Sequence, residues 1–96
     1  MNSTFLASLP TTQDISEALW VVGRDYGREW EVDEQVAIAR QLRAYEAVTG
    51  KFPTHKEIKA AFERFGVRYP ARGYGQAVHA RLVRLYGPVT RREPRG

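Results

Sequence analysis

The stretch that decides the fold is Phe52-Pro53-Thr54-His55-Lys56-Glu57-Ile58, because it holds the clearest helix start in the chain. The Thr54 side chain can accept a hydrogen bond from the backbone N–H of Glu57, while the Glu57 side chain reaches back to the N–H of Thr54. This reciprocal arrangement is a capping box, and it predicts a helix directly after Thr54 that Gly66 ends. Its apolar positions are Ile58, Ala61, Phe62 and Phe65.

Helical periodicity continues on both sides of this start. We expect a first helix from Thr11 or Thr12 to Gly27, a second from an Asp33 N-cap to Gly50, and a last one from about Tyr74 to Tyr86. The first helix carries an apolar stripe of Ile15, Ala18, Leu19, Val22 and Tyr26. The inward positions of the second are Ala37, Ile38, Leu42, Tyr45 and Val48. Those of the last are Val78, Leu82, Leu85 and Tyr86.

No segment shows the alternating pattern of a strand over a useful length. The sequence therefore predicts an all-α fold, a small bundle of about four helices. A chain of 96 residues suits one domain. We expect residues 1–10 to be a loose lead-in, residues 11–87 a single helical domain, and residues 88–96 a flexible basic tail.

The net charge of +4 conceals a strong asymmetry. Residues 1–50 hold four basic and eight acidic side chains, whereas residues 51–96 hold eleven basic and three acidic ones. An excess of positive charge confined to one half indicates a polyanionic partner, and nucleic acid is the commonest. The alternative is that the acidic half folds against the basic half and neutralises it.

The sequence contains few of the residue patterns that catalysis or metal binding needs. There is no cysteine, which excludes disulfides, thiolate metal sites and a cysteine nucleophile. His55 and His79 are the only histidines and have no metal-ligand spacing, and the serines lack a Gly-x-Ser-x-Gly elbow. We expect no catalytic residues, no cofactor and no metal. No apolar run approaches the roughly 20 residues that a membrane span needs, so we expect a cytoplasmic protein without a membrane partner.

The order of a long helix, a Gly-x-Phe-Pro-Thr turn, a short capped helix, a loop and a basic helix is similar to a known family. It resembles the N-terminal DNA-binding domain of LexA-type repressors and related plasmid and phage regulators. The resemblance rests on Thr49–Ile58 and covers residues 36–87. It implies a helix-turn-helix-like tri-helical unit whose third helix crosses the phosphate backbone and whose fourth enters the major groove. Two departures stand out: the loop at residues 67–73 exceeds the usual turn of about 3 to 4 residues, and no complete wing follows.

The candidate DNA contacts lie on the last two helices, their loop and the tail. Arginine and glutamine on an outer helix face can pair with guanine and adenine edges, and lysines suit phosphates. The expected contacts are Lys56, Lys59, Arg68, Arg72, Tyr74, Gln76, His79, Arg81, Arg84, Arg91 and Arg92, with Arg95 as a further tail cation. The alternative for each is an ordinary solvated basic face.

Two tryptophans beside an acidic run suggest a different partner. Trp20 lies about 140° from Ile15 round the first helix, away from its apolar stripe, and Trp30 sits among carboxylates. Tryptophan is enriched in binding hot spots, so Trp20 and Trp30 are candidate protein-interface anchors, with the core as the alternative for both.

The leading hypothesis is a small DNA-binding protein that uses this basic surface: a phage, plasmid or bacterial regulator of transcription or an accessory factor. The runner-up is a protein-binding adaptor, such as a phage-type inhibitor of a host protein. RNA comes third, with Tyr69 and Tyr74 as stacking residues. A homodimer formed through the first helix is also plausible.

Overall fold

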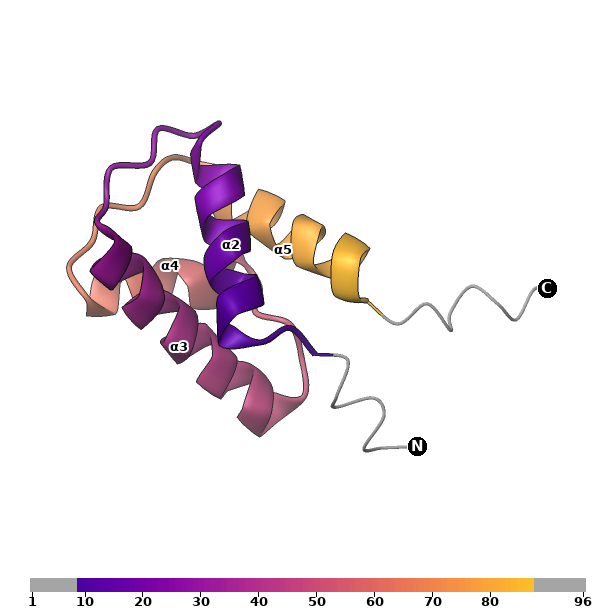
Figure 1. Ribbon diagram of the computed structural model, residues 1–96. Coiled ribbons are helices and arrows are strands. Elements are labelled where there is room, and N and C mark those ends of the chain that lie inside the picture. The colour runs from indigo at the N-terminus through magenta and orange to yellow at the C-terminus, as the bar shows by residue number, and fades with distance from the viewer. Residues whose placement is uncertain (1–8, 88–96) are drawn as a thin grey trace.

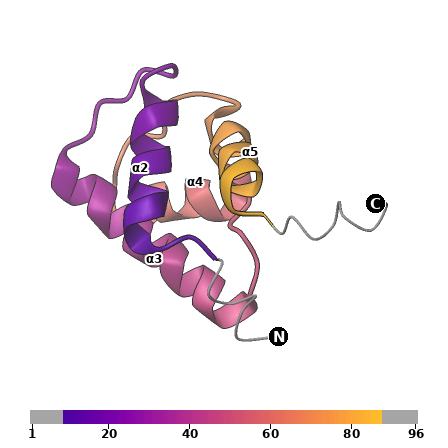
Figure 2. The same cartoon turned by 45° about the vertical axis from the view of Figure 1, so that its right-hand side comes forward.

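The computed structural model describes residues 9–87, which form four α-helices. They are α2 (Thr12–Gly23), α3 (Val32–Thr49), α4 (His55–Arg64) and α5 (Tyr74–Tyr86), and no strand occurs in this range. The predicted all-α bundle is confirmed. Helix α2 packs against α3 and α5, and α4 also packs against α3 and α5, so the four helices form a closed ring (Figure 1). The turned view in Figure 2 keeps α2 and α5 side by side, with α3 below them.

Local capping accounts for three of the helix starts. In α2, Thr11 and Asp14 form a capping box with bonds of 2.9 and 3.1 Å, and in α4 the predicted box of Thr54 and Glu57 is present. The predicted start of α3 at Asp33 is wrong by two residues. The N-cap is Glu31, whose backbone N–H donates to the Glu34 carboxylate at 2.8 Å, a pairing of two glutamates that the usual preference for aspartate, serine or threonine at this position does not anticipate.

The first helix is shorter than predicted. It ends at Gly23 rather than Gly27, and a turn over residues 24–27 follows. Gly27 lies within that turn with a φ of +78°, a left-handed conformation that glycine adopts without strain.

Aromatic rings form the centre of the core. The ring of Tyr74 lies edge-on to those of Trp30, Phe62 and Tyr69 at centroid distances of 5.6–5.8 Å, and the rings of Trp30 and Phe62 are 5.1 Å apart. Such edge-to-face pairs add stability beyond the area that they bury. Since these rings come from α4, α5 and two connections, one cluster joins most of the chain.

Two buried polar bonds contradict the predicted roles of Tyr74 and Trp30. Tyr74 is fully buried and its hydroxyl donates to the backbone oxygen of Leu19 at 2.8 Å, so it can neither contact DNA nor stack on an RNA base. Trp30 is only 7% exposed, and its Nε1–H donates to Gln35 Oε1 at 2.9 Å. It is a core residue, not a protein-interface anchor.

Several other predicted core positions are wrong. Val48 is 84% exposed, because it lies about 120° from Leu42 round α3, and the buried face of that helix includes Gln35, Ala39 and Glu46 instead. Phe65 follows the last turn of α4 as its C-cap and is half-exposed. Leu85 is exposed at the C-terminal end of α5, which protrudes from the bundle (Figure 1).

The folded domain begins slightly earlier than the sequence predicts. Leu9 and Pro10, assigned to a loose lead-in, are buried, and the Pro10 carbonyl accepts a hydrogen bond from Arg43 Nη1 at 3.1 Å. The tail cations Arg91, Arg92 and Arg95 lie outside the described residues. Among residues 9–87, no helix is long and apolar enough to span a bilayer.

Candidate nucleic-acid interface

The starts of α4 and α5 are in close contact at Gly75. A Cβ atom at this position would lie 2.8 Å from the Cβ and 2.9 Å from the Cα of His55, and 2.6 Å from the Tyr69 hydroxyl. The backbone N–H of Gly75 donates to that hydroxyl at 2.7 Å. Only glycine fits here, so this contact fixes how α5 sits beside α4.

Next to this contact, the two helices flank an open hollow of about 420 Å³. Its lining residues are Thr54, His55, Lys56, Gln76 and His79. We call it the α4–α5 hollow. It brings together three of the predicted DNA contacts, namely Lys56, Gln76 and His79. His55 was missing from that prediction, although its place directly after the Thr54 cap is the signal that puts it beside the same helix start.

His79 is held in one orientation. Its Nδ1 lies 2.9 Å from the backbone oxygen of Pro53, and since a carbonyl only accepts, the ring donates through Nδ1–H. This leaves Nε2 as the ring nitrogen available to the hollow. The same bond ties α5 to the turn that precedes α4.

The predicted arginines of α5 do not join this hollow. Arg81 and Arg84 line a second hollow, of about 340 Å³, between α5 and the end of α2. Asp25 and Tyr26 line its other side, with small or apolar residues between them: Val21, Val22, Ala77 and Ala80. The predicted contacts on α5 thus fall on two flanks of one helix.

Three further candidates lie outside both hollows: Lys59 on α4, and Arg68 and Arg72 on the connection between α4 and α5. Arg68 pairs with Glu29 of the acidic half at 2.7 Å, both side chains being largely exposed. Arg72 is exposed, and the Lys59 ammonium lies 5.8 Å from the centroid of the Tyr69 ring. Among the described residues, Arg68–Glu29 is the one ion pair between the two halves, and Asp25 of the acidic half also lines the hollow that holds Arg81 and Arg84.

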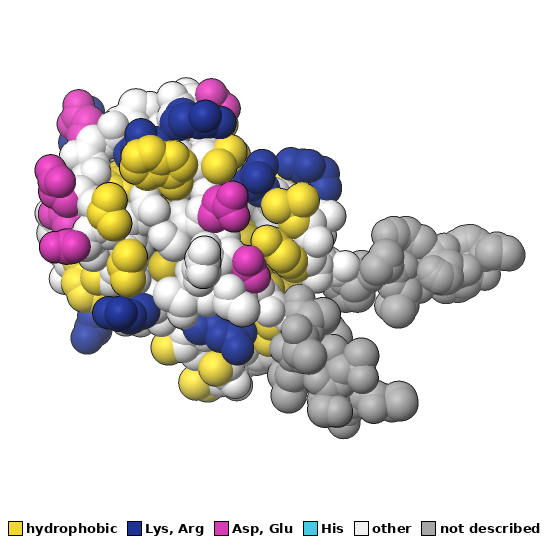
Figure 3. Space-filling model, viewed as in Figure 1, with side chains coloured by type: hydrophobic (Ala, Val, Ile, Leu, Met, Phe, Trp, Pro, Cys, Tyr) yellow, Lys and Arg dark blue, Asp and Glu magenta, His cyan; other side chains and the backbone are white. Residues whose placement is uncertain are grey.

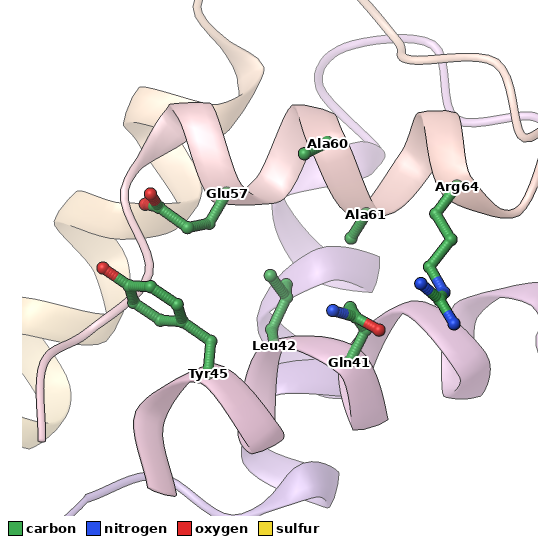
Figure 4. Close-up of a pocket in the computed structure, with 7 residues that line it drawn as sticks. All are labelled: Gln41, Leu42, Tyr45, Glu57, Ala60, Ala61 and Arg64. Atoms are coloured by element: carbon green, nitrogen blue, oxygen red, sulfur yellow. The ribbon is translucent and has the colours of Figure 1, made fainter. Parts of the chain in front are cut away.

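A third hollow lies between α3 and α4 and measures about 230 Å³ (Figure 4). Glu57 and Tyr45 stand at one end of it and Gln41 and Arg64 at the other. The hydrogen bond from Thr54 holds the pKa of Glu57 below its usual range. Glu57 therefore stays ionised as a cap for α4 and is unsuited to supplying a proton.

The face formed by α2 has a mixed character. Figure 3 shows Lys and Arg side chains there in separate groups, with Asp and Glu side chains between them. Trp20 is 39% exposed, with the Arg28 guanidinium 3.4 Å above its ring, and Arg28 Nη1 donates to the Trp20 backbone oxygen at 2.9 Å. The predicted position of Trp20, away from the apolar stripe of the first helix, is confirmed.

Within residues 9–87, no three or more histidine, aspartate or glutamate side chains gather in a way that could hold a metal ion. Comparison with models of known protein families, with curated proteins and with solved structures found no match for this chain.

Proposed function

We propose that this chain is a small DNA-binding protein that contacts a duplex through α5 and the start of α4. The observation that carries the proposal is the α4–α5 hollow, where Lys56, Gln76 and His79 converge and no acidic side chain is part of the lining. Residues 51–87 hold eight basic and two acidic side chains, which favours a polyanion.

The proposed roles follow from side-chain chemistry and exposure. Arg84 is exposed on α5 and suits a base edge, since arginine pairs with guanine in the major groove, whereas the exposed Gln76 lies beside Lys56 at the α4–α5 hollow. Lys56, Lys59 and Arg72 are exposed beside that helix and suit phosphates, which position the protein without reading sequence. Arg81 would add a contact on the other flank of α5, and the tail arginines Arg91 and Arg92 would add further positive charge.

This arrangement differs from a compact helix-turn-helix. Nine residues, 65–73, join α4 to α5, whereas the compact motif uses about 3 to 4. We therefore propose a tri-helical variant in a cytoplasmic regulator or accessory factor of phage, plasmid or bacterial origin. A homodimer that reads paired half-sites fits the same proposal.

The salt dependence of duplex binding tests this function. We expect the full chain to bind duplex DNA with an affinity that falls steeply as salt rises, and Lys56→Ala to lower the slope of log K against log salt by about 0.9, the value of one phosphate contact. Arg84→Ala should weaken binding to preferred sequences more than binding to other sequences. Fluorescence anisotropy across a salt series, with an RNA control, measures both.

The matched control is Arg24→Ala, which removes an exposed cation just after α2, outside this surface. It should leave the slope within error of the unmodified protein. Absence of duplex binding at low salt, or an equal effect of Arg24→Ala, would contradict the proposal.

A protein-binding adaptor is the second candidate, and the half-exposed Trp20 beneath Arg28 favours it. A tryptophan and an arginine at one exposed point are the residue types most enriched in binding hot spots. If this function holds, the chain captures a partner from a host lysate, and this capture survives nuclease treatment. Trp20→Ala should abolish the capture, while Lys56→Ala should leave it unchanged. Capture that nuclease abolishes would instead point to nucleic acid.

A further inference from the structure

We propose that the α4–α5 hollow is a seat for a single phosphate group, held by Lys56, Gln76 and His79, and that it takes one phosphate of the DNA backbone. This inference rests on the proposed function and assigns a ligand group to one part of the surface. Lys56 on α4 lies 20 and 23 residues before Gln76 and His79 on α5, yet all three side chains line the same hollow.

The chemistry of the lining suits a tetrahedral oxyanion. Lys56 supplies an ammonium, Gln76 an amide N–H and His79 a ring nitrogen, and Thr54 and His55 complete the lining without a carboxylate. Hydrogen bonds between a charged donor and a charged acceptor are stronger than neutral ones. The hollow measures about 420 Å³ and is open to solvent, so a phosphate group can enter it with part of its hydration.

The seat is held in place before any ligand binds. The Gly75–Tyr69 bond and the His79–Pro53 bond tie the first two turns of α5 to residues on either side of α4. Groups that are already fixed lose less conformational entropy on binding. Two of the three side chains, Gln76 and His79, therefore stand on backbone whose position is set by the fold.

The orientation of His79 makes the seat sensitive to pH. Because Nδ1–H already donates to Pro53, Nε2 can donate to an oxyanion only when the ring is an imidazolium. The groups that face it are Lys56 and His55 on α4 and Gln76 on its own helix, and none of them carries a negative charge. Binding of the anion and protonation of His79 should therefore support each other.

Inorganic sulfate is the probe, since it has the shape of a phosphate group and a constant charge between about pH 6 and pH 8. We expect saturable shifts of the amide signals of Lys56, Gln76 and His79 when the full chain is titrated with sulfate at constant ionic strength. Lys56→Gln should weaken binding about tenfold. The affinity should be higher near pH 6 than near pH 8, a difference that His79→Gln removes.

Lys59→Gln is the matched control, because it makes the same charge change one turn further along α4 at a residue outside the lining. If Lys59→Gln and Lys56→Gln lower the sulfate affinity equally, or if the amide shifts never saturate, the phosphate site is ruled out even if duplex DNA binds. Sulfate binding without duplex binding would overturn its assignment to DNA. Sulfate and duplex binding that both fall with Lys56→Gln support the proposal.

Discussion

Replacing Trp30 by alanine is expected to lower the free energy of unfolding by about 3–5 kcal/mol, the usual cost of removing a buried tryptophan or phenylalanine. The indole is 7% exposed and packs against Phe62 and Tyr74 at centroid distances of 5.1 and 5.8 Å. Its loss also leaves the buried Gln35 side chain without the 2.9 Å bond to Nε1. Urea unfolding followed by far-UV circular dichroism measures the change.

Trp20→Ala is the control for this prediction, because it removes the same side chain from the surface. Its stacking on Arg28 is worth about 0.5–1 kcal/mol at an exposed site, so the two variants should differ several-fold. Similar losses of stability for both would mean that Trp30 does not occupy the core. Trp30→Phe should lie between them, since it keeps an aromatic ring but loses the bond to Gln35.

The two tryptophans also show where helical periodicity predicts burial and where it does not. Trp20 belongs to α2, so its angle from Ile15 was enough to place it off the core face. Trp30 lies in the connection between α2 and α3, where no period applies. Its burial depends on Phe62 and Tyr74, more than 30 residues away, and a pattern along the chain carries no such information.

Polar residues in the core account for the wrong face of α3. Gln35 is buried because it accepts from Trp30 and donates to Ser16 of α2 at 2.9 Å, and Glu46 is buried beside Arg43. A prediction from hydrophobic periodicity places both polar residues on the outer face of α3, and it therefore placed Val48 on the inner face. The partners that make their burial tolerable come largely from other elements and cannot be identified from α3 alone.

The candidate site was predictable in composition but not in arrangement. The capping box located the start of α4, and the charge asymmetry pointed to the second half of the chain. Which side of α5 meets Lys56 depends on the close packing of Gly75 on His55, a contact between helices. That contact gathers Gln76 and His79 at the hollow and leaves Arg81 and Arg84 on the opposite flank.

Glu46 is the most unfavourable buried group among the described residues. Its side chain is fully buried, Oε1 lies 3.4 Å from Arg43 Nη1, and Oε2 has no hydrogen-bond partner. Burial raises its pKa from 4.5 to about 7, an effect that Arg43 reduces and the nearby charge of Asp14 increases. The carboxylate form is therefore the costly one.

Glu46→Gln is expected to stabilise the protein above neutral pH and to have little effect near pH 5. Since the pKa of Glu46 is higher in the folded than in the unfolded chain, the folded protein binds the extra proton between about pH 4.5 and 7, and stability falls as pH rises through that window. The shift corresponds to about 3 kcal/mol. Thermal unfolding from pH 5 to 8 should show a midpoint higher by on the order of 10 °C at the alkaline end.

Comparing the variant with the unmodified chain isolates Glu46 from other titrating groups. The lowered pKa of Glu57 acts in the opposite sense, because its stabilising contribution is complete above about pH 4.5 and is lost only in more acidic solution. Glu63→Gln, at an exposed position of α4, should follow the unmodified chain throughout. If the unfolding midpoints of Glu46→Gln and of the unmodified chain change in parallel between pH 5 and 8, the prediction is contradicted. The folded protein would then tolerate a charged Glu46.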